Sequence, residues 1–174
     1  TRIEFSKSSL AYNVQYKKGQ KNQLMEKQGR PVIASQFGTG RVLTDAMTIR
    51  RKVFMIEENV SEKDEIDGRD DRCLHYVFYV DNWYPVSTAR IYLIGKNVWH
   101  IGRVATLKTF RGRGYARQIL KRIEKNAESK NIKKLELEAQ VHAISFYESL
   151  GYEAFGNIFL DAGIQHRRME KLLK

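Results

Sequence analysis

The sequence has little of what marks an exported or membrane-embedded protein. Cys73 is the one cysteine among 174 residues, which excludes a disulfide framework and a cysteine metal site. The longest apolar run, Tyr76–Val80, is far too short to span a membrane. No signal-peptide pattern follows Thr1, and we expect a trimmed N-terminus. These absences predict a cytoplasmic protein with no membrane partner.

The sequence also lacks the spacing of several ligand sites. His75, His100 and His166 do not share the separation of metal ligands, so we expect no metal. No Gly-Lys-Ser/Thr follows Gly114, which excludes a Walker A loop, and Arg117 stands where a Rossmann fingerprint needs its third glycine. A different kind of phosphate site must therefore be considered.

Positive charge is abundant and unevenly distributed. Lys and Arg number 31 against 20 Asp and Glu, a net charge of +11. Residues 103–134 hold eleven basic and two acidic side chains, whereas residues 57–71 hold eight acidic and two basic ones. A basic field steers anionic ligands, but nucleic acid attracts the same charge, and a solvated helix surface carries it without a ligand. Charge alone does not choose between these three interpretations.

The composition, 42% hydrophobic and 29% charged, suits one folded domain with alternating strands and helices. Residues 1–30 are polar and read as an N-terminal extension with a weak strand or hairpin, and residues 31–174 as the domain. We expect strands at Val32–Phe37, Leu74–Val80, Val86–Ile94, Val98–Leu107, Leu135–Ala139, Tyr152–Phe155 and His166–Leu172. We expect helices at Leu43–Ile56, from Tyr115 onward and at Ala143–Leu150, with an acidic loop at Asn59–Asp71.

A glycine turn joins the fourth expected strand to the second expected helix. Val104-Ala105-Thr106 lies in the strand, and Arg111-Gly112-Arg113-Gly114-Tyr115-Ala116 leads into the helix. Glycines let backbone N–H groups approach a phosphate, and the positive end of the helix dipole faces it. The turn therefore predicts an anion cradle, although an ordinary basic strand-to-helix turn would have the same composition.

Two signatures in this order resemble the GNAT superfamily of acetyl-coenzyme A-dependent N-acetyltransferases. The first is the Arg-x-x-Gly-x-Gly/Ala pattern at Arg111–Ala116. The second is Leu135–Tyr152, similar to a strand followed by Asn-x-x-Ala-x-x-Phe-Tyr-x-x-x-Gly-Phe. Ile49–Gly68 and Phe159–Met169 resemble a largely uncharacterised bacterial subgroup, with Gln165 in place of a proline. The resemblance covers roughly residues 32–174.

This resemblance implies a single-domain α/β (α+β) GNAT fold. Its sheet is mixed and mostly antiparallel, with about seven strands, helices on both faces and a central V-shaped splay. The splay leaves backbone groups of Arg103–Thr106 available to the pantetheine arm of acetyl-CoA. Gln140 replaces the family's frequent asparagine. The implied cofactor-binding residues are Val104, Ala105, Thr106, Arg111, Gly112, Arg113, Gly114, Tyr115, Ala116, Arg117, Gln140 and Phe146.

The implied reaction is attack of an amine on the thioester in a ternary complex. A backbone N–H near Val104 or Ala105 could stabilise the oxyanion, and Tyr147 stands where the family places the acid that protonates the thiolate. In a short amphipathic helix, Tyr147 could instead be a packing residue. Glu138 and Glu57 are both candidate bases. His142 is a third, and the sequence does not choose between them.

The resemblance does not name the acceptor. The acidic loop follows a helix that borders the acceptor side of the cleft in this family, so a cationic amine is one prediction, and a solvated loop is the other. A homodimer is compatible with the resemblance. Two rival functions stay open: a basic nucleic-acid-binding module, and a GNAT domain that binds acetyl-CoA without catalysis. Because the aromatic residues mostly alternate into the expected core, we expect no nucleic-acid partner.

Overall fold

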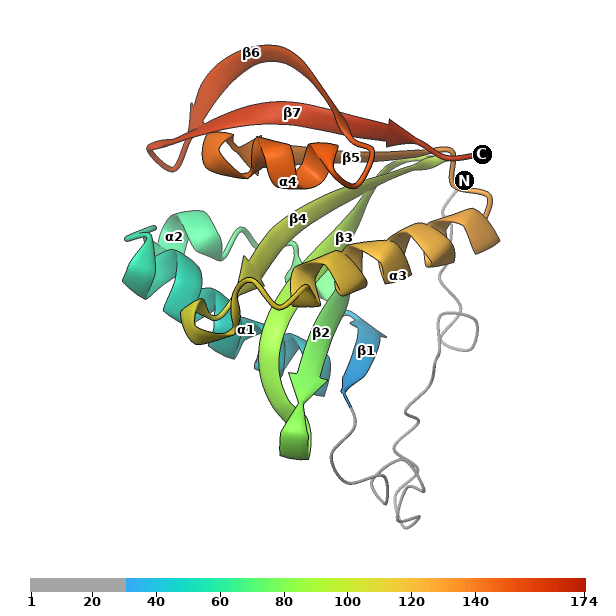
Figure 1. Ribbon diagram of the computed structural model, residues 1–174. Helices are drawn as coiled ribbons and strands as arrows, with labels where there is room; N and C mark the ends of the chain where they lie inside the picture. Colours follow the sequence, from blue (N-terminus) through green and yellow to red (C-terminus); the bar gives the residue numbers. More distant parts are fainter. Residues whose placement is uncertain (1–30) are drawn as a thin grey trace.

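The computed structural model describes residues 31–174, so the strand or hairpin expected within residues 1–30 lies outside the described residues. Seven strands form one sheet in the order β1-β2-β3-β4-β5-β7-β6 (Figure 1). The strands are β1 Val32–Phe37, β2 Leu74–Val80, β3 Tyr84–Gly95, β4 Val98–Thr106, β5 Lys134–Gln140, β6 Glu153–Asp161 and β7 Ile164–Leu172. The α-helices are α1 Arg41–Arg50, α2 Glu62–Glu65, α3 Tyr115–Ser129 and α4 Ile144–Glu148.

Helices cover both faces of the sheet, because side chains of successive strand residues point to opposite faces. On β2, Tyr76 and Phe78 belong to the core that also contains the buried face of α3. Val77 and Tyr79 belong to a second core beneath α1. The expected fold, a mixed and mostly antiparallel sheet between two helical layers, is confirmed.

The helix expected over Leu43–Ile56 is two segments. The α-helix α1 ends at Arg50, and a π-helical segment, η1, follows at Arg51–Glu57. At its end, the Glu58 N–H donates to the Val53 carbonyl, five residues back, at 2.9 Å. An apolar stripe does not distinguish these two helix types, because it specifies a face and not the hydrogen-bond partner.

Two further elements differ from expectation. The acidic loop contains the short helix α2, whose N-terminus is capped by the Ser61 hydroxyl accepting the Asp64 N–H. Strand β6 extends to Asp161, well beyond the expected end at Phe155. It is an edge strand and is mostly exposed, so its sequence lacks the alternation that marks a half-buried strand.

The sheet splays between its two central parallel strands. β4 pairs with β5 only from Val98 opposite Lys134 to Ile101 opposite Leu137. Beyond that point β4 continues to Thr106 and β5 to Gln140 without pairing to each other. The ends of β4 and β5 therefore separate and leave a wedge-shaped gap between them.

Candidate active site

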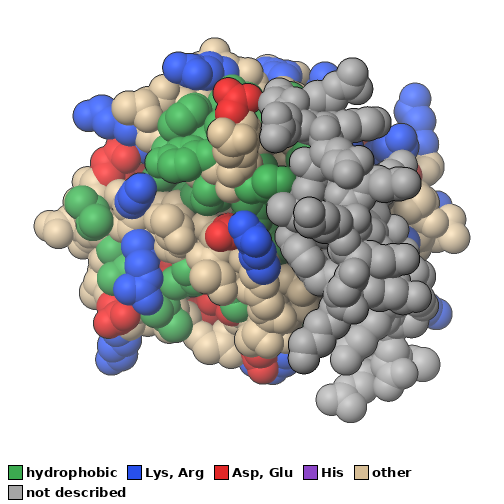
Figure 2. Space-filling model, turned by 90° about the horizontal axis from the view of Figure 1, so that it is seen from below, with side chains coloured by type: hydrophobic (Ala, Val, Ile, Leu, Met, Phe, Trp, Pro, Cys, Tyr) green, Lys and Arg blue, Asp and Glu red, His purple; other side chains and the backbone are tan. Residues whose placement is uncertain are grey.

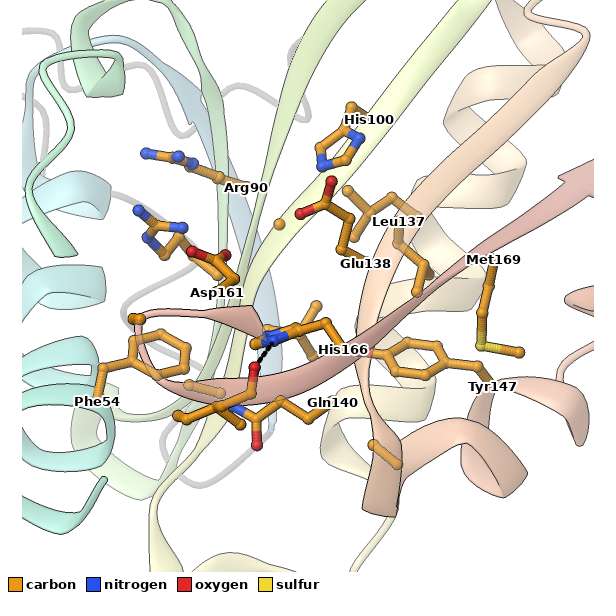
Figure 3. A pocket seen from close by; sticks show the side chains of 18 of the residues that line it. Phe54, Arg90, His100, Leu137, Glu138, Gln140, Tyr147, Asp161, His166 and Met169 are labelled. Carbon is orange, nitrogen blue, oxygen red and sulfur yellow. Dashed lines mark hydrogen bonds between the residues drawn. The ribbon is translucent and has the colours of Figure 1, made fainter. Parts of the chain in front are cut away.

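A cleft of about 1460 Å³ opens at this splay. Its walls come from η1, the α2 segment, β3, β4, β5, β6, β7 and α4. Eight of the expected site residues border it: Glu57, Val104, Ala105, Thr106, Arg111, Glu138, Gln140 and Tyr147. Residues separated by up to 90 positions are thus brought to one cavity (Figure 3).

A bulge in β4 exposes backbone groups to this cleft. Thr88 lies opposite Ala105 and Arg90 opposite Gly102, so Arg103 and Val104 together face Ala89 alone. Arg103 has φ +51, a left-handed conformation that non-glycine residues rarely adopt. The Leu107 N–H bonds to Val86 on β3. Because backbone groups alternate in direction along a strand, the Val104 N–H faces the splay and the Ala105 N–H faces β3.

A network of arginines and carboxylates reaches the wall of the cleft through Glu65, Asp67 and Arg90. Arg50 is 1% exposed and donates to the Glu65 and Asp70 carboxylates at 3.0 and 2.8 Å. Arg90 donates to Asp67 and Asp70, each at 3.0 Å. Burial by itself would raise the pKa of Asp67, but the hydrogen bonds and charge of Arg90 outweigh it and hold that pKa below its usual range. Three carboxylates of the acidic segment thus neutralise the protein's own arginines.

Tyr147 reaches the cleft from α4. It is 7% exposed, and its ring packs against Tyr152 with centroids 5.9 Å apart. In Figure 3 its side chain extends toward His166. Burial raises the pKa of Tyr147, so its hydroxyl keeps its proton at neutral pH.

The candidate bases differ in their surroundings. Arg111 donates to both Glu57 oxygens, at 2.6 and 2.8 Å, and this contact lowers the pKa of Glu57, which makes it a weaker base. Glu138 and His100 point toward one another in the cleft (Figure 3). Burial lowers the pKa of His100, against the opposing charges of Glu138 and Glu136, so its imidazole is neutral at pH 7 and able to accept a proton.

Gln140 links the end of β5 to the end of η1. Its amide nitrogen donates to both carboxylate oxygens of Glu58, at 3.0 and 3.2 Å. Its amide oxygen lies 2.7 Å from Nε2 of His142, the third candidate base. The longer amide that replaces asparagine therefore has protein partners on both sides of the splay.

Arg111, at the start of the glycine turn, borders the cleft, whereas Gly112 and Gly114 do not line it. Gly112 and Gly114 have φ +75 and +80, and a Cβ built on either would meet no atom within 4 Å. Gly114 precedes α3 and provides no side-chain cap, so the first N–H groups of the helix have no intrahelical partner. Of the remaining expected residues, Arg113, Tyr115, Ala116 and Arg117 lie at the start of α3, and Phe146 lies on α4.

Side chains at the start of α3 contact neighbouring groups of the protein. Tyr115 is half-buried and packs on Phe78 with ring centroids 4.6 Å apart. The Arg117 guanidinium lies over the Phe146 ring and donates to the Ser149 hydroxyl at 2.8 Å. These contacts join the start of α3 to α4 and leave the glycine backbone open to an anion.

Several residues of the cleft were missed from the sequence. Arg90 and Arg103 line the cleft and pair with the Asp67 carboxylate, 23 and 36 positions away, and no local pattern marks such a partner. His100 could have been found, because it lies between buried Trp99 and Ile101 and so points to the opposite face.

Known proteins share this fold and sequence. The family model described as Acetyltransferase (GNAT) domain matches residues 52–173. Two uncharacterised Bacillus subtilis proteins, YyaT and the N-acetyltransferase YjcF, are each 35% identical over 74% of this chain and over 88% and 91% of their own lengths. The Escherichia coli ElaA structure is 27% identical, with a TM-score of 0.69 over 80% of this chain and 99% of ElaA.

These matches define the protein as an acyl-CoA N-acyltransferase. The chain belongs to the GNAT acetyltransferase family, and the fold implies an acyl-CoA co-substrate. None of the helices in residues 31–174 is both long and apolar enough to cross a membrane.

Proposed function

We propose that this protein transfers an acetyl group from acetyl-CoA to a primary amine by direct attack in a ternary complex. The observation that carries this proposal is the splay, because it leaves the end of β4, where Val104 lies, without a β5 partner at a cleft that Tyr147 also reaches. A pantetheine arm can take the place of the missing strand partner between β4 and β5. Its pyrophosphate would then lie against the backbone of Gly112–Gly114 at the start of α3.

The reaction needs three groups at the thioester. The amine nitrogen bonds to the carbonyl carbon, and the Val104 N–H stabilises the oxyanion that forms. When the C–S bond breaks, the Tyr147 hydroxyl protonates the departing thiolate. The nitrogen loses its extra proton to Glu138 or His100, and Tyr147 regains a proton from solvent, so that no phenolate accumulates in a site where burial disfavours it.

The face of the molecule in Figure 2 does not support a nucleic-acid surface. On the face in Figure 2, lysine and arginine side chains are scattered among acidic and apolar ones and do not form a continuous basic strip. A nucleic-acid surface needs clustered basic residues along one face or element. The buried single cysteine fits a reducing compartment, and we place the reaction in the cytoplasm.

A turnover screen tests the proposal. Acetyl-CoA is offered with polyamines, aminoglycosides, amino acids and peptides, and released coenzyme A thiol is measured. We expect release that depends on one amine class and a product acetylated at nitrogen. Tight acetyl-CoA binding with no turnover on any amine would instead favour the non-catalytic, acetyl-CoA-binding alternative.

A further inference from the structure

The strained bulge in β4 is held by contacts from outside the sheet. The Arg103 side chain donates to the Glu65 carbonyl at 2.9 Å from Nη2 and 3.3 Å from Nε. Nη2 also lies 3.3 Å from the Asp64 carbonyl and 3.4 Å from the Asp67 carboxylate. The guanidinium thus binds the last residues of α2, where helix carbonyls lack intrahelical partners.

The partner of this guanidinium is itself fixed. The Glu65 carboxylate is fully buried and bonded to Arg50 at the end of α1. Glu65 therefore connects two arginines: its carboxylate bonds to Arg50 and also lies 3.4 Å from Nε of Arg103, and its carbonyl accepts from Arg103. A continuous chain of contacts runs from α1 through α2 to the bulge.

The contacts from α1 through α2 to the bulge are needed because the bulge is strained. A non-glycine residue at positive φ is strained, and such strain persists only where surrounding contacts require it. If the bulge relaxed, β4 would shift by one residue against β3, and the backbone groups beyond it would change direction. The residue whose N–H would move first is Val104.

We propose that Arg103 is a positioning residue, which fixes the β4 bulge through Glu65 so that the Val104 N–H points at the thioester carbonyl. The inference rests on the proposed acetyl-transfer function. Arg103 itself touches no reacting atom in this account, and its effect is carried by the backbone. A misplacement of about 1 Å at a reacting centre can cost about a hundredfold in rate.

The test measures the thioester carbonyl and does not require the acceptor. Infrared spectra of bound [1-¹³C]acetyl-CoA are recorded for the whole protein and for Arg103→Met. A hydrogen bond from Val104 lowers the C=O stretching frequency relative to free acetyl-CoA. We expect Arg103→Met to lose at least half of this lowering while its acetyl-CoA dissociation constant stays within threefold of the parent.

Two further variants keep the result interpretable. Arg168→Met removes an arginine from the β7 side of the same cleft and should keep the full frequency lowering. Arg103→Lys retains a cation and should give an intermediate value if Arg103→Met does not fold. An unchanged frequency in both Arg103 variants would overturn the inference.

Failure of the proposed function would be seen in the parent protein and not in the Arg103 variants. A parent protein that binds acetyl-CoA without lowering the frequency would remove the oxyanion role of the bulge, and the inference with it. A parent that does not bind acetyl-CoA at all would overturn the proposed function itself. Once an acceptor is known, kcat of Arg103→Met should fall about tenfold or more.

Discussion

At the residue scale, two neighbouring tyrosines differ in their expected roles: Tyr147 acts in the reaction and Tyr152 only packs. Tyr147 borders the cleft, whereas the Tyr152 hydroxyl is buried with no hydrogen-bond partner among residues 31–174. We expect Tyr147→Phe to lower kcat about a hundredfold with little change in coenzyme A affinity, because only the proton donor is lost. Turnover and calorimetry measure the two effects.

Tyr152→Phe is the matched control. It removes a hydroxyl from the same aromatic pair and should leave kcat within twofold of the parent. If both substitutions reduce kcat equally, the effect comes from packing; if neither does, a water or another group protonates the thiolate.

His75 makes stability depend on pH near neutrality. It is 1% exposed, its Nε2 lies 2.7 Å from the Asp70 carbonyl, and burial lowers its pKa below 6.5. A folded-state pKa below the unfolded value means that the stability contributed by neutral His75 is complete above about pH 6.5. That stability is lost as pH falls from there through the folded-state pKa.

Urea denaturation between about pH 8 and pH 5 tests this. The free energy of unfolding of the parent should fall across this range, and that of His75→Gln should fall less. The carboxylates of Asp67 and Asp70, whose pKa values are lowered by their arginines despite burial, lose their contribution only below about pH 4. Parallel curves for parent and variant would exclude His75 as the source.

At the element scale, the start of α3 should bind the pyrophosphate. Gly114→Asp places a carboxylate beside the N–H groups of the helix and should weaken coenzyme A binding at least tenfold, about 1.4 kcal/mol. Gly114→Ala introduces the same left-handed strain at φ +80 without charge, so it should lose less. Equal affinities for parent and a folded Gly114→Asp would remove the glycine turn from the site.

The helix α2 is held in place by a buried ion pair. Glu65→Gln leaves the Arg50 charge without its main partner and should cost about 3 kcal/mol in the free energy of unfolding. Glu62→Gln, an exposed residue on the same helix, should cost less than about 0.5 kcal/mol. Urea titration measures both free energies of unfolding. Equal losses would mean that the buried ion pair of Glu65 contributes no more to stability than an exposed glutamate does.

The sequence predicted the elements that have strong periodicity or a family signature. The stripe of α3, the seven strands and the glycine turn all follow from local pattern. It did not predict η1, α2 or the length of β6, because a π-helix shares the stripe of an α-helix and short or exposed elements lack one. The pairing of Arg103 with Glu65 joins residues 38 positions apart, so only the fold could place it beside the reacting centre.

At the scale of the whole molecule, the distribution of charge bears on the acceptor. Glu65, Asp67 and Asp70 are bonded to arginines, so a cationic acceptor must be attracted by other carboxylates. Glu138 and Asp161 both line the cleft, from β5 and from the end of β6. These two side chains would hold a second positive charge on the amine, and their attraction would be screened by salt.

Two probes that differ only in that second charge test the idea: 1,4-diaminobutane and 4-amino-1-butanol. We expect a higher kcat/KM for the diamine at low salt. The advantage should shrink severalfold as the Debye length falls from about 20 Å to about 4 Å. Asp161→Asn should raise KM for the diamine alone, and Asp81→Asn, in the exposed β2–β3 turn, should change neither. Equal kcat/KM for both amines at every salt concentration would show that the cleft does not select for cations.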